Sequence, residues 1–361
     1  MSQFPTCRVL FSCLALASVV ARAEPLDLSR VPAKAVWFMH ADIDAAREST
    51  VINRMYERAM KMHPRLEQMM TLATGMVGMD PRKDLHDITV YGLDTDKKNA
   101  VMIVQAAANR EFLERMVEKA RDHETMKHRS YTLHKWTHKG GKGHAGEPVV
   151  GAFYKDTMMV FARSVGQVEL ALDVLDQTTT SVGPESPLAG RTRPGSILVG
   201  RAAEVDPHTK CPVLRQGTGF RVAMGEWSGS SFYRARLEMQ SVEAARQVVD
   251  VTAGLAALAR LRFADEADVM NLVAGLEVMS DGKTCMIAWN ATADELWQVV
   301  SRMADQVEAK LAAKHAGKKA GCSCGKETCG CGGKGTCPMD TQPATAGGDE
   351  DEQRPFRDDE F

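Results

Sequence analysis

The stretch VPAKAVWFMHADIDAARES, residues 31–49, decides the fold class of this chain. Its centre, Ala35–Ala41, is a run of apolar and aromatic side chains with the length of one buried strand. The run ends at the acidic pair Asp42 and Asp44, and aspartate is a residue type that caps helices. We therefore predict a buried strand that passes directly into a helix.

The helix predicted after this strand has methionines at a spacing of seven residues, at Met55, Met62, Met69 and Met76. Seven residues are close to two helical turns, so these side chains fall on one face, which we predict to pack in the core. Soft Cu(I) ligation by thioethers is the alternative, but the spacing favours packing. Pro64 lacks an amide proton and disfavours helical angles at His63, which predicts two helices or a kinked one.

The pattern outside this region changes between strand and helix periods in the same order twice. In the first half we predict Asp87–Leu93 paired with Ala100–Ala106, a helix over Asn109–His123, strands near Tyr131–Trp136 and Val149–Ala162, and a helix over Val165–Leu175. In the second half we predict the strand Ile197–Ala203, the hairpin Gly219–Met224 with Ser231–Met239, helices over Ser241–Leu261 and Glu266–Leu276, the hairpin Glu277–Met279 with Thr284–Trp289, and the helix Ala293–His315. The fold class is therefore α+β, with two related units of antiparallel sheet and packed helices.

The composition divides the chain further. Residues 179–196 are rich in Thr, Ser, Pro and Gly, which predicts a linker between units at 24–178 and 197–316. The segment 317–361 is poor in large apolar side chains, and we predict that it is a disordered tail.

The first 23 residues resemble a secretory signal peptide, with Arg8, a short apolar run and a small-x-small site ending at Ala23. The run is shorter than the roughly 20 residues that span a bilayer, so we expect cleavage and a secreted or periplasmic protein without a stable membrane span. A lipoprotein box at Cys13 is the weaker alternative, because the apolar run continues past it. Cleavage changes the formal charge from −2 to −4, and the absence of a basic stripe argues against nucleic-acid binding.

Several patterns resemble catalytic or metal motifs without fitting them. The histidines of His123–His128 are five residues apart, so on a helix they would not share the face that a zinc peptidase needs. Four histidines cluster at His128, His134, His138 and His144, and a metal site there competes with a solvated polar hairpin. An enzyme site assembled from distant residues stays open, with His40, Asp42, Asp44 and Glu226 as its candidates.

The strongest site signal lies in the tail, where five cysteines fall within sixteen residues at Cys322, Cys324, Cys329, Cys331 and Cys337. Two C-x-C pairs let thiolates approach one soft ion, which predicts binding of Cu(I) or Zn²⁺. Disulfides within or between chains are the alternative in an oxidising compartment, and no role is the third. The body cysteines Cys211 and Cys285 are expected either to pair or to be buried. The C-x-C array resembles those of metallothioneins.

The opening residues 31–49 and the alternation of hairpins and helices resemble secreted bacterial proteins of unknown function, a resemblance that implies no activity. We predict an exported, non-catalytic binding or scaffolding protein of the cell envelope, whose partner is an unidentified protein or other envelope component. A metal-handling protein that uses the C-x-C array is the first alternative. An enzyme with a spatially assembled site is the second.

Overall fold

The computed structural model describes residues 26–138 and 146–320. The strands are β1 (Trp37–Asp42), β2 (Leu85–Gly92), β3 (Val101–Ala106), β4 (Glu124–His128), β5 (Tyr131–His138), β6 (Glu147–Tyr154), β7 (Met158–Ala162), β8 (Ser196–Ala202), β9 (Gly217–Trp227), β10 (Ser230–Met239), β11 (Leu276–Asp281) and β12 (Thr284–Thr292). The α-helices are α1 (Ile43–Glu48), α2 (Thr50–Met62), α3 (Pro64–Val77), α4 (Arg110–Glu118), α5 (Val165–Leu175), α6 (Pro212–Arg215), α7 (Val242–Arg262), α8 (Ala267–Ala274) and α9 (Ala293–Ala320). The described residues up to Asp305 belong to one compact unit, and those from Gln306 to Ala320 belong to a second.

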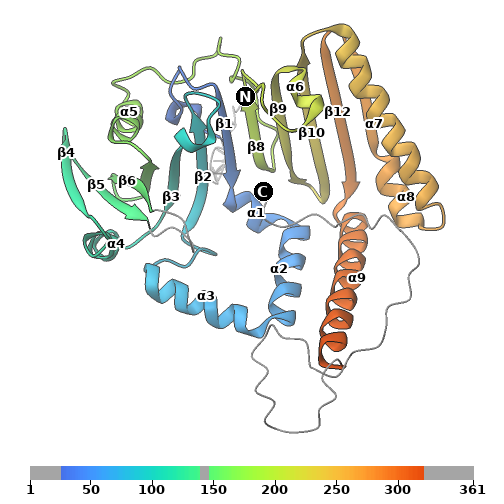
Figure 1. Cartoon of the computed structure of the whole chain (residues 1–361), viewed down its shortest axis with the longest axis horizontal. Coiled ribbons are helices and arrows are strands. Elements are labelled where there is room, and N and C mark those ends of the chain that lie inside the picture. Colours follow the sequence, from blue (N-terminus) through green and yellow to red (C-terminus); the bar gives the residue numbers. More distant parts are fainter. Residues whose placement is uncertain (1–25, 139–145, 321–361) are drawn as a thin grey trace, which may run out of the picture. The chain divides into compact units, whose positions relative to one another are not determined.

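These strands form one antiparallel sheet in which the same strand order occurs twice (Figure 1). Over the described residues the order is β11-β12-β10-β9-β8-β1-β2-β3-β7-β6-β5-β4. Outward from the centre, each half places its first strand, then the hairpin β9–β10 or β2–β3, and then the hairpin β12–β11 or β7–β6. The first half adds β5 and β4 at its edge. The predicted α+β class, with two related antiparallel units, is confirmed.

The centre of the sheet is the pair formed by β1 and β8, the first strand of each half. Met39 lies opposite Gly200 in this pairing. Phe38 and His40 are buried, whereas Met39 between them is exposed, as expected for side chains that alternate between the two faces of a strand. The Asp42 carboxylate then accepts a hydrogen bond from the Ala45 amide at 2.8 Å and begins α1. The predicted passage from strand to helix is confirmed.

Helices α5 and α7 cover opposite faces of the sheet, one in each half, while Leu113 of α4 packs on the other face of the first half. In the first half α5 packs on β6 and β7, and its fully buried Val168 and Leu172 join a core that includes Tyr91 and Ile103. In the second half α7 packs on β10, β11 and β12, over the buried Cys285. Because neighbouring residues of a strand point to opposite faces, the side chains next to Cys285 point away from α7.

The helix after β12 does not cover that other face. It follows β12 as α5 follows β7, but its first part is bonded to α2: Arg54 contacts Asp294 at 2.7 Å, and Arg58 contacts Asp305 at 2.6 Å. Among the described helices, none packs across β9, β10 and β12 on the face opposite α7. The described helices therefore leave this face of the second half open.

The packing predicted for the methionine stripe is wrong. The segment breaks into α2 and α3 at His63, as the proline predicts. Yet Met55 and Met62 of α2 and Met69 of α3 are 49%, 37% and 64% exposed, because neither helix packs on the described sheet. The side chain of Met76 lies outside the described residues. The stripe shows that helical periodicity fixes a shared face but not what covers it.

Other differences from the predictions are local. The helix predicted to end at His123 ends at Glu118, and the zinc-peptidase-like segment that follows is strand β4, with Asp122 at a φ of 55° marking the turn. The single strand region near 149–162 is the hairpin β6–β7. The last helix runs past Gly317 to Ala320, because one glycine weakens a helix without ending it.

Residues 179–196 contain no helix or long strand, yet they pack on the sheet. Val182 and Leu188 belong to the core that α5 covers, and Ser181 forms a bridge to Pro32. Whether this segment separates two independently folding units stays a prediction, which limited proteolysis checks.

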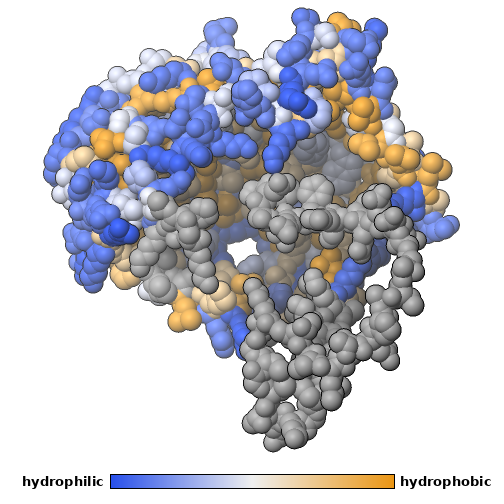
Figure 2. Space-filling view, viewed as in Figure 1, coloured by the Kyte–Doolittle hydropathy of each residue, from blue (hydrophilic) through white to orange (hydrophobic). Residues whose placement is uncertain are grey.

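No described helix is long and apolar enough to cross a membrane. Exposed apolar side chains do follow α7, at Val251, Leu255 and Leu258 (Figure 2).

Candidate functional site

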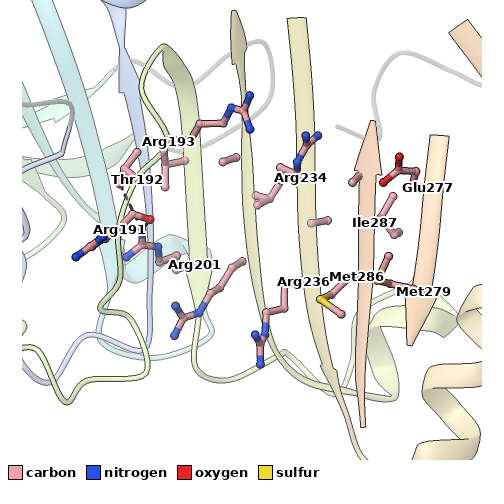
Figure 3. Close-up of a pocket in the computed structure, with 16 residues that line it drawn as sticks. Arg191, Thr192, Arg193, Arg201, Arg234, Arg236, Glu277, Met279, Met286 and Ile287 are labelled. Atoms are coloured by element: carbon pink, nitrogen blue, oxygen red, sulfur yellow. Dashed lines mark hydrogen bonds between the residues drawn. The ribbon is translucent and has the colours of Figure 1, made fainter. Parts of the chain in front are cut away.

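The open face of the second half has a row of three arginines on adjacent strands (Figure 3). Arg201 of β8 lies directly opposite Arg221 of β9, and Arg221 lies directly opposite Arg236 of β10. Like charges directly opposite each other destabilise a sheet. A fold that keeps three of them in one row therefore needs a compensating anion or a large screening effect from solvent.

Three further arginines surround this row. Arg234 is two residues from Arg236 on β10 and shares its face, while Arg191 and Arg193 come from the loop before β8. The Arg193 guanidinium lies over the Phe232 ring at 4.6 Å from its centroid, a cation–π contact that fixes its direction. The loop and the three strands thus place six guanidinium groups around one groove.

Most of these guanidinium groups have no carboxylate partner. Within the described chain, only Arg236 forms an ion pair, with Glu238 at 2.7 Å. Arg221 donates to the Pro187 carbonyl at 2.9 Å, and Arg234 donates to the Trp289 carbonyl at 2.7 Å. These carbonyl contacts orient the side chains without neutralising them, so the groove keeps a net positive charge.

Arg201 is the anchor of the groove wall. Its side chain is buried, and it donates to the Leu188 carbonyl at 2.8 Å and the Gly190 carbonyl at 3.1 Å. It also donates to the Arg191 carbonyl at 3.2 Å, which ties the loop to β8. Burial, together with the neighbouring Arg221, lowers the pKa of Arg201 to about 10. An anion beside it would oppose both effects.

The same electrostatic strain acts on Arg234. Burial lowers the pKa of its guanidinium, and the charge of Arg193 lowers it further, while Glu277 acts in the opposite direction. Two arginines of one groove therefore have a depressed pKa because they are desolvated beside other cations. This combination marks a candidate binding site, since perturbed groups cluster at functional sites.

The groove has an apolar floor and a volume of about 440 Å³. Val199, Ala223 and Ala288 line its floor on β8, β9 and β12, and Met279 and Met286 line its end on β11 and β12. Met286 lies opposite Arg236 and Met279 lies opposite Met286, so the arginine row continues directly into two thioethers. Chemically, the groove offers several forks for carboxylate or phosphate oxygens beside an apolar surface.

Each of the four residues suggested for an enzyme site makes a hydrogen bond or an ion pair within the fold. His40 is buried and its Nδ1 is 2.9 Å from the Thr89 hydroxyl, and Asp42 caps α1. Asp44 contacts His86 and Arg47. Burial raises the pKa of Asp42, and the Ala45 amide and His40 act against that rise.

Glu226 lies at a different place, at the beginning of α2. Its carboxylate accepts hydrogen bonds from the Thr50 amide at 3.0 Å, the Val51 amide at 3.2 Å and the Ser49 hydroxyl at 2.8 Å. Burial alone raises the pKa of this carboxyl, but the bonds from Thr50, Ser49 and Val51 outweigh burial and lower it. Glu226 therefore links β9 of the second half to the beginning of α2.

The described histidines do not converge on one point. The nitrogens of His123 and His134 are 3.1 Å apart, and His128 contacts Asp173 at 2.8 Å. His138 is exposed at the end of β5, and His144 lies outside the described residues. Among the described residues, no three metal-ligating side chains are placed to hold one ion.

The cysteines of the predicted metal site lie outside the described residues: Cys322, Cys324, Cys329, Cys331 and Cys337. Of the two body cysteines, Cys211 is exposed and Cys285 is buried, and they do not form a disulfide. Burial raises the pKa of the Cys285 thiol. The prediction that body cysteines either pair or are buried thus holds for Cys285 only.

Sequence reasoning missed the arginine groove, although part of its signal was visible. Arg234 and Arg236 alternate within a segment predicted to be a strand, which puts both on one face. Their partners Arg201 and Arg221 are distant in the chain, and only the strand register brings them together. A search for contiguous basic stripes could not find a row that runs across strands.

Comparison with known proteins adds little to this geometry. No protein-family model matches the chain, and no curated protein matches it. Three crystal forms of the protein TP0453 show a distant structural similarity, with identities of 10%, 9% and 8% and a TM-score of 0.41 in each case. The alignments cover 78% of this chain and 98% or 99% of TP0453. A TM-score at that level supports no inference about function.

Proposed function

We propose that this chain is a non-catalytic binding protein whose arginine groove takes an anionic ligand. The observation that carries the proposal is the row of Arg201, Arg221 and Arg236, three opposed cations on a face that no described helix covers. Repulsion within this row destabilises the sheet when no anion is bound. An anion that binds between the guanidinium groups offsets that repulsion. The volume of about 440 Å³ falls in the usual range for small-molecule sites.

Isothermal titration calorimetry tests this proposal by measuring the affinity of the full chain for pyrophosphate, in a buffer without other multivalent anions. We expect binding that weakens as salt is added, because exposed charge interactions are screened. The double variant Arg221→Gln/Arg236→Gln should bind pyrophosphate at least about tenfold more weakly, because it loses two charge-assisted contacts.

The control is a double variant with the same charge change elsewhere. Arg110→Gln/Arg115→Gln alters two arginines of α4, each paired with a glutamate of the same helix. This control should bind pyrophosphate like the unaltered chain. Equal loss in both variants would show a general charge effect, and no binding to the unaltered chain would refute an anion site.

Export to the cell envelope and a scaffolding role are further parts of this proposal. The signal-like residues 1–23, which support export, lie outside the described structure. A precursor and mature protein that differ by about 23 residues in intact mass would support export.

The C-x-C array supports metal handling as a second function. Under reducing conditions a peptide over residues 321–338 should bind Cu(I) or Zn²⁺, and Cys324→Ser/Cys329→Ser should weaken binding sharply. Tail cysteines found fully oxidised and metal-free in the native compartment would refute that role.

A further inference from the structure

We infer that the ligand of the arginine groove is an anionic amphiphile, with its headgroup among the guanidinium groups and its alkyl chain over Met279 and Met286. This inference rests on the proposed anion site and adds the chemistry of the rest of the ligand. The argument comes from how charge is distributed along the groove.

Charge and apolar surface separate along the cross-strand row. The three arginines occupy β8, β9 and β10, and the same row continues as Met286 on β12 and Met279 on β11. Adjacent strands lie about 4.8 Å apart, so the apolar end extends roughly 10 Å beyond the last arginine. A ligand that is only a small anion would leave this end in water.

The end of the groove on β11 and β12 is open and mainly apolar, with the carboxylate of Glu277 at its edge, opposite Ala288. Met279 is 52% exposed, and the side chains of Met286 and Ala288 beside it are partly exposed. Methionine has a flexible, polarisable side chain that fits irregular apolar ligands. Ala288 of β12 lies directly opposite Arg234 of β10, so this end adjoins the headgroup region. An alkyl chain needs no hydrogen-bond partners, and these side chains offer none.

The recognition of the headgroup follows from the loop before β8. Arg201 fixes that loop through three carbonyls, and Arg193 is held over Phe232. The guanidinium groups are thus preorganised from two sides, which reduces the entropy lost on binding. A phosphate or carboxylate group fits this arrangement because arginine binds such oxygens in a bidentate manner.

Titration of the full chain with three probes tests the inference: dodecyl phosphate below its micelle concentration, inorganic phosphate, and the uncharged dodecyl maltoside. Burial of only three methylene groups is expected to make dodecyl phosphate bind about 50-fold more tightly than inorganic phosphate. Dodecyl maltoside should bind far more weakly than dodecyl phosphate, because it lacks the anion.

Variants of the two methionines test where the alkyl chain of the ligand binds. Met279→Gln/Met286→Gln should reduce the affinity for dodecyl phosphate to near that for inorganic phosphate, and should leave phosphate binding unchanged. Met224→Gln is the matched control, since Met224 is 41% exposed but alternates with Ala223 to the opposite face of β9. The control should keep the full difference between the two probes.

The outcomes separate the inference from the proposed function. Phosphate and dodecyl phosphate of equal affinity would overturn the amphiphile and leave the anion site intact. No effect of the double methionine variant, an equal effect of Met224→Gln, or tight binding of dodecyl maltoside would also overturn it. If no anionic probe binds, the proposed function fails together with the inference.

Discussion

Two cross-strand rows on one face of the sheet, one in each half, have opposite chemistry. Outward from His40, the row in the first half is Thr89, Ile103, Val160 and Ala152. Outward from Arg201, the row in the second half is Arg221, Arg236, Met286 and Met279. The first row lies in the core that α5 covers, and the second lies on the face that no described helix covers.

This difference teaches that the strand order does not determine what a face does. Both halves have the same arrangement of strands, so the backbone supports either a helix or a ligand on that face. The side chains decide between these uses, because apolar residues gain free energy when α5 removes them from water, whereas guanidinium groups lose hydration there. The absence of a covering helix and the presence of arginines are therefore two aspects of one adaptation.

The largest effect is expected when an arginine, the residue type of the open face, replaces an apolar residue in the core that α5 covers. Ile103→Arg puts a cation at a fully buried position with no partner, and we expect it to destabilise the protein by at least about 4 kcal/mol. Chemical denaturation monitored by circular dichroism measures this. The reverse change, Arg236→Ile, should alter stability by less than about 1 kcal/mol. Similar losses from both changes would mean that the two faces are equally covered.

A smaller effect is expected at the contact between the halves. Glu226→Ala removes the acceptor for the first amides of α2 and should destabilise the protein by about 1 kcal/mol, a typical loss for a helix cap. The pKa of Glu226 is below its ordinary value of 4.5 in the folded state, so its contribution is present above that pH and is lost as pH falls through the folded pKa.

The difference in stability between Glu226→Ala and the unaltered chain should therefore shrink as the pH falls below about 4.5. Thermal unfolding at several pH values, with both proteins in the same buffers, provides the measurement. A difference that stays constant into the acid range would show that the carboxylate charge is not what stabilises α2.

The smallest effect on stability is expected for the double arginine variant that should weaken anion binding. Arg221→Gln/Arg236→Gln removes two cations from a row of three, and the relief of repulsion offsets the lost contacts to Pro187 and Glu238. We expect the unliganded protein to be as stable as the unaltered chain, or more stable, within about 1 kcal/mol. A loss of several kcal/mol on denaturation would instead make the arginine row a structural feature.

The sequence by itself determined the local elements of this protein. Ala35–Ala41 predicted the central strand because its apolar run has strand length, and Pro64 predicted the break between α2 and α3 because its ring excludes a helical hydrogen bond. The recurrence of strands and helices predicted the α+β class and the two related units. These features depend on neighbours in the chain, which a sequence displays directly.

Only the tertiary structure decided which surfaces are covered and which residues meet. Periodicity puts the methionines on one face within each of α2 and α3, yet at Met55 and Met69 that face is exposed, because no described strand packs on it. Arg201, Arg221 and Arg236 form a row because the register of three strands places them opposite one another. Register and coverage depend on residues far apart in the chain, so no local pattern encodes them.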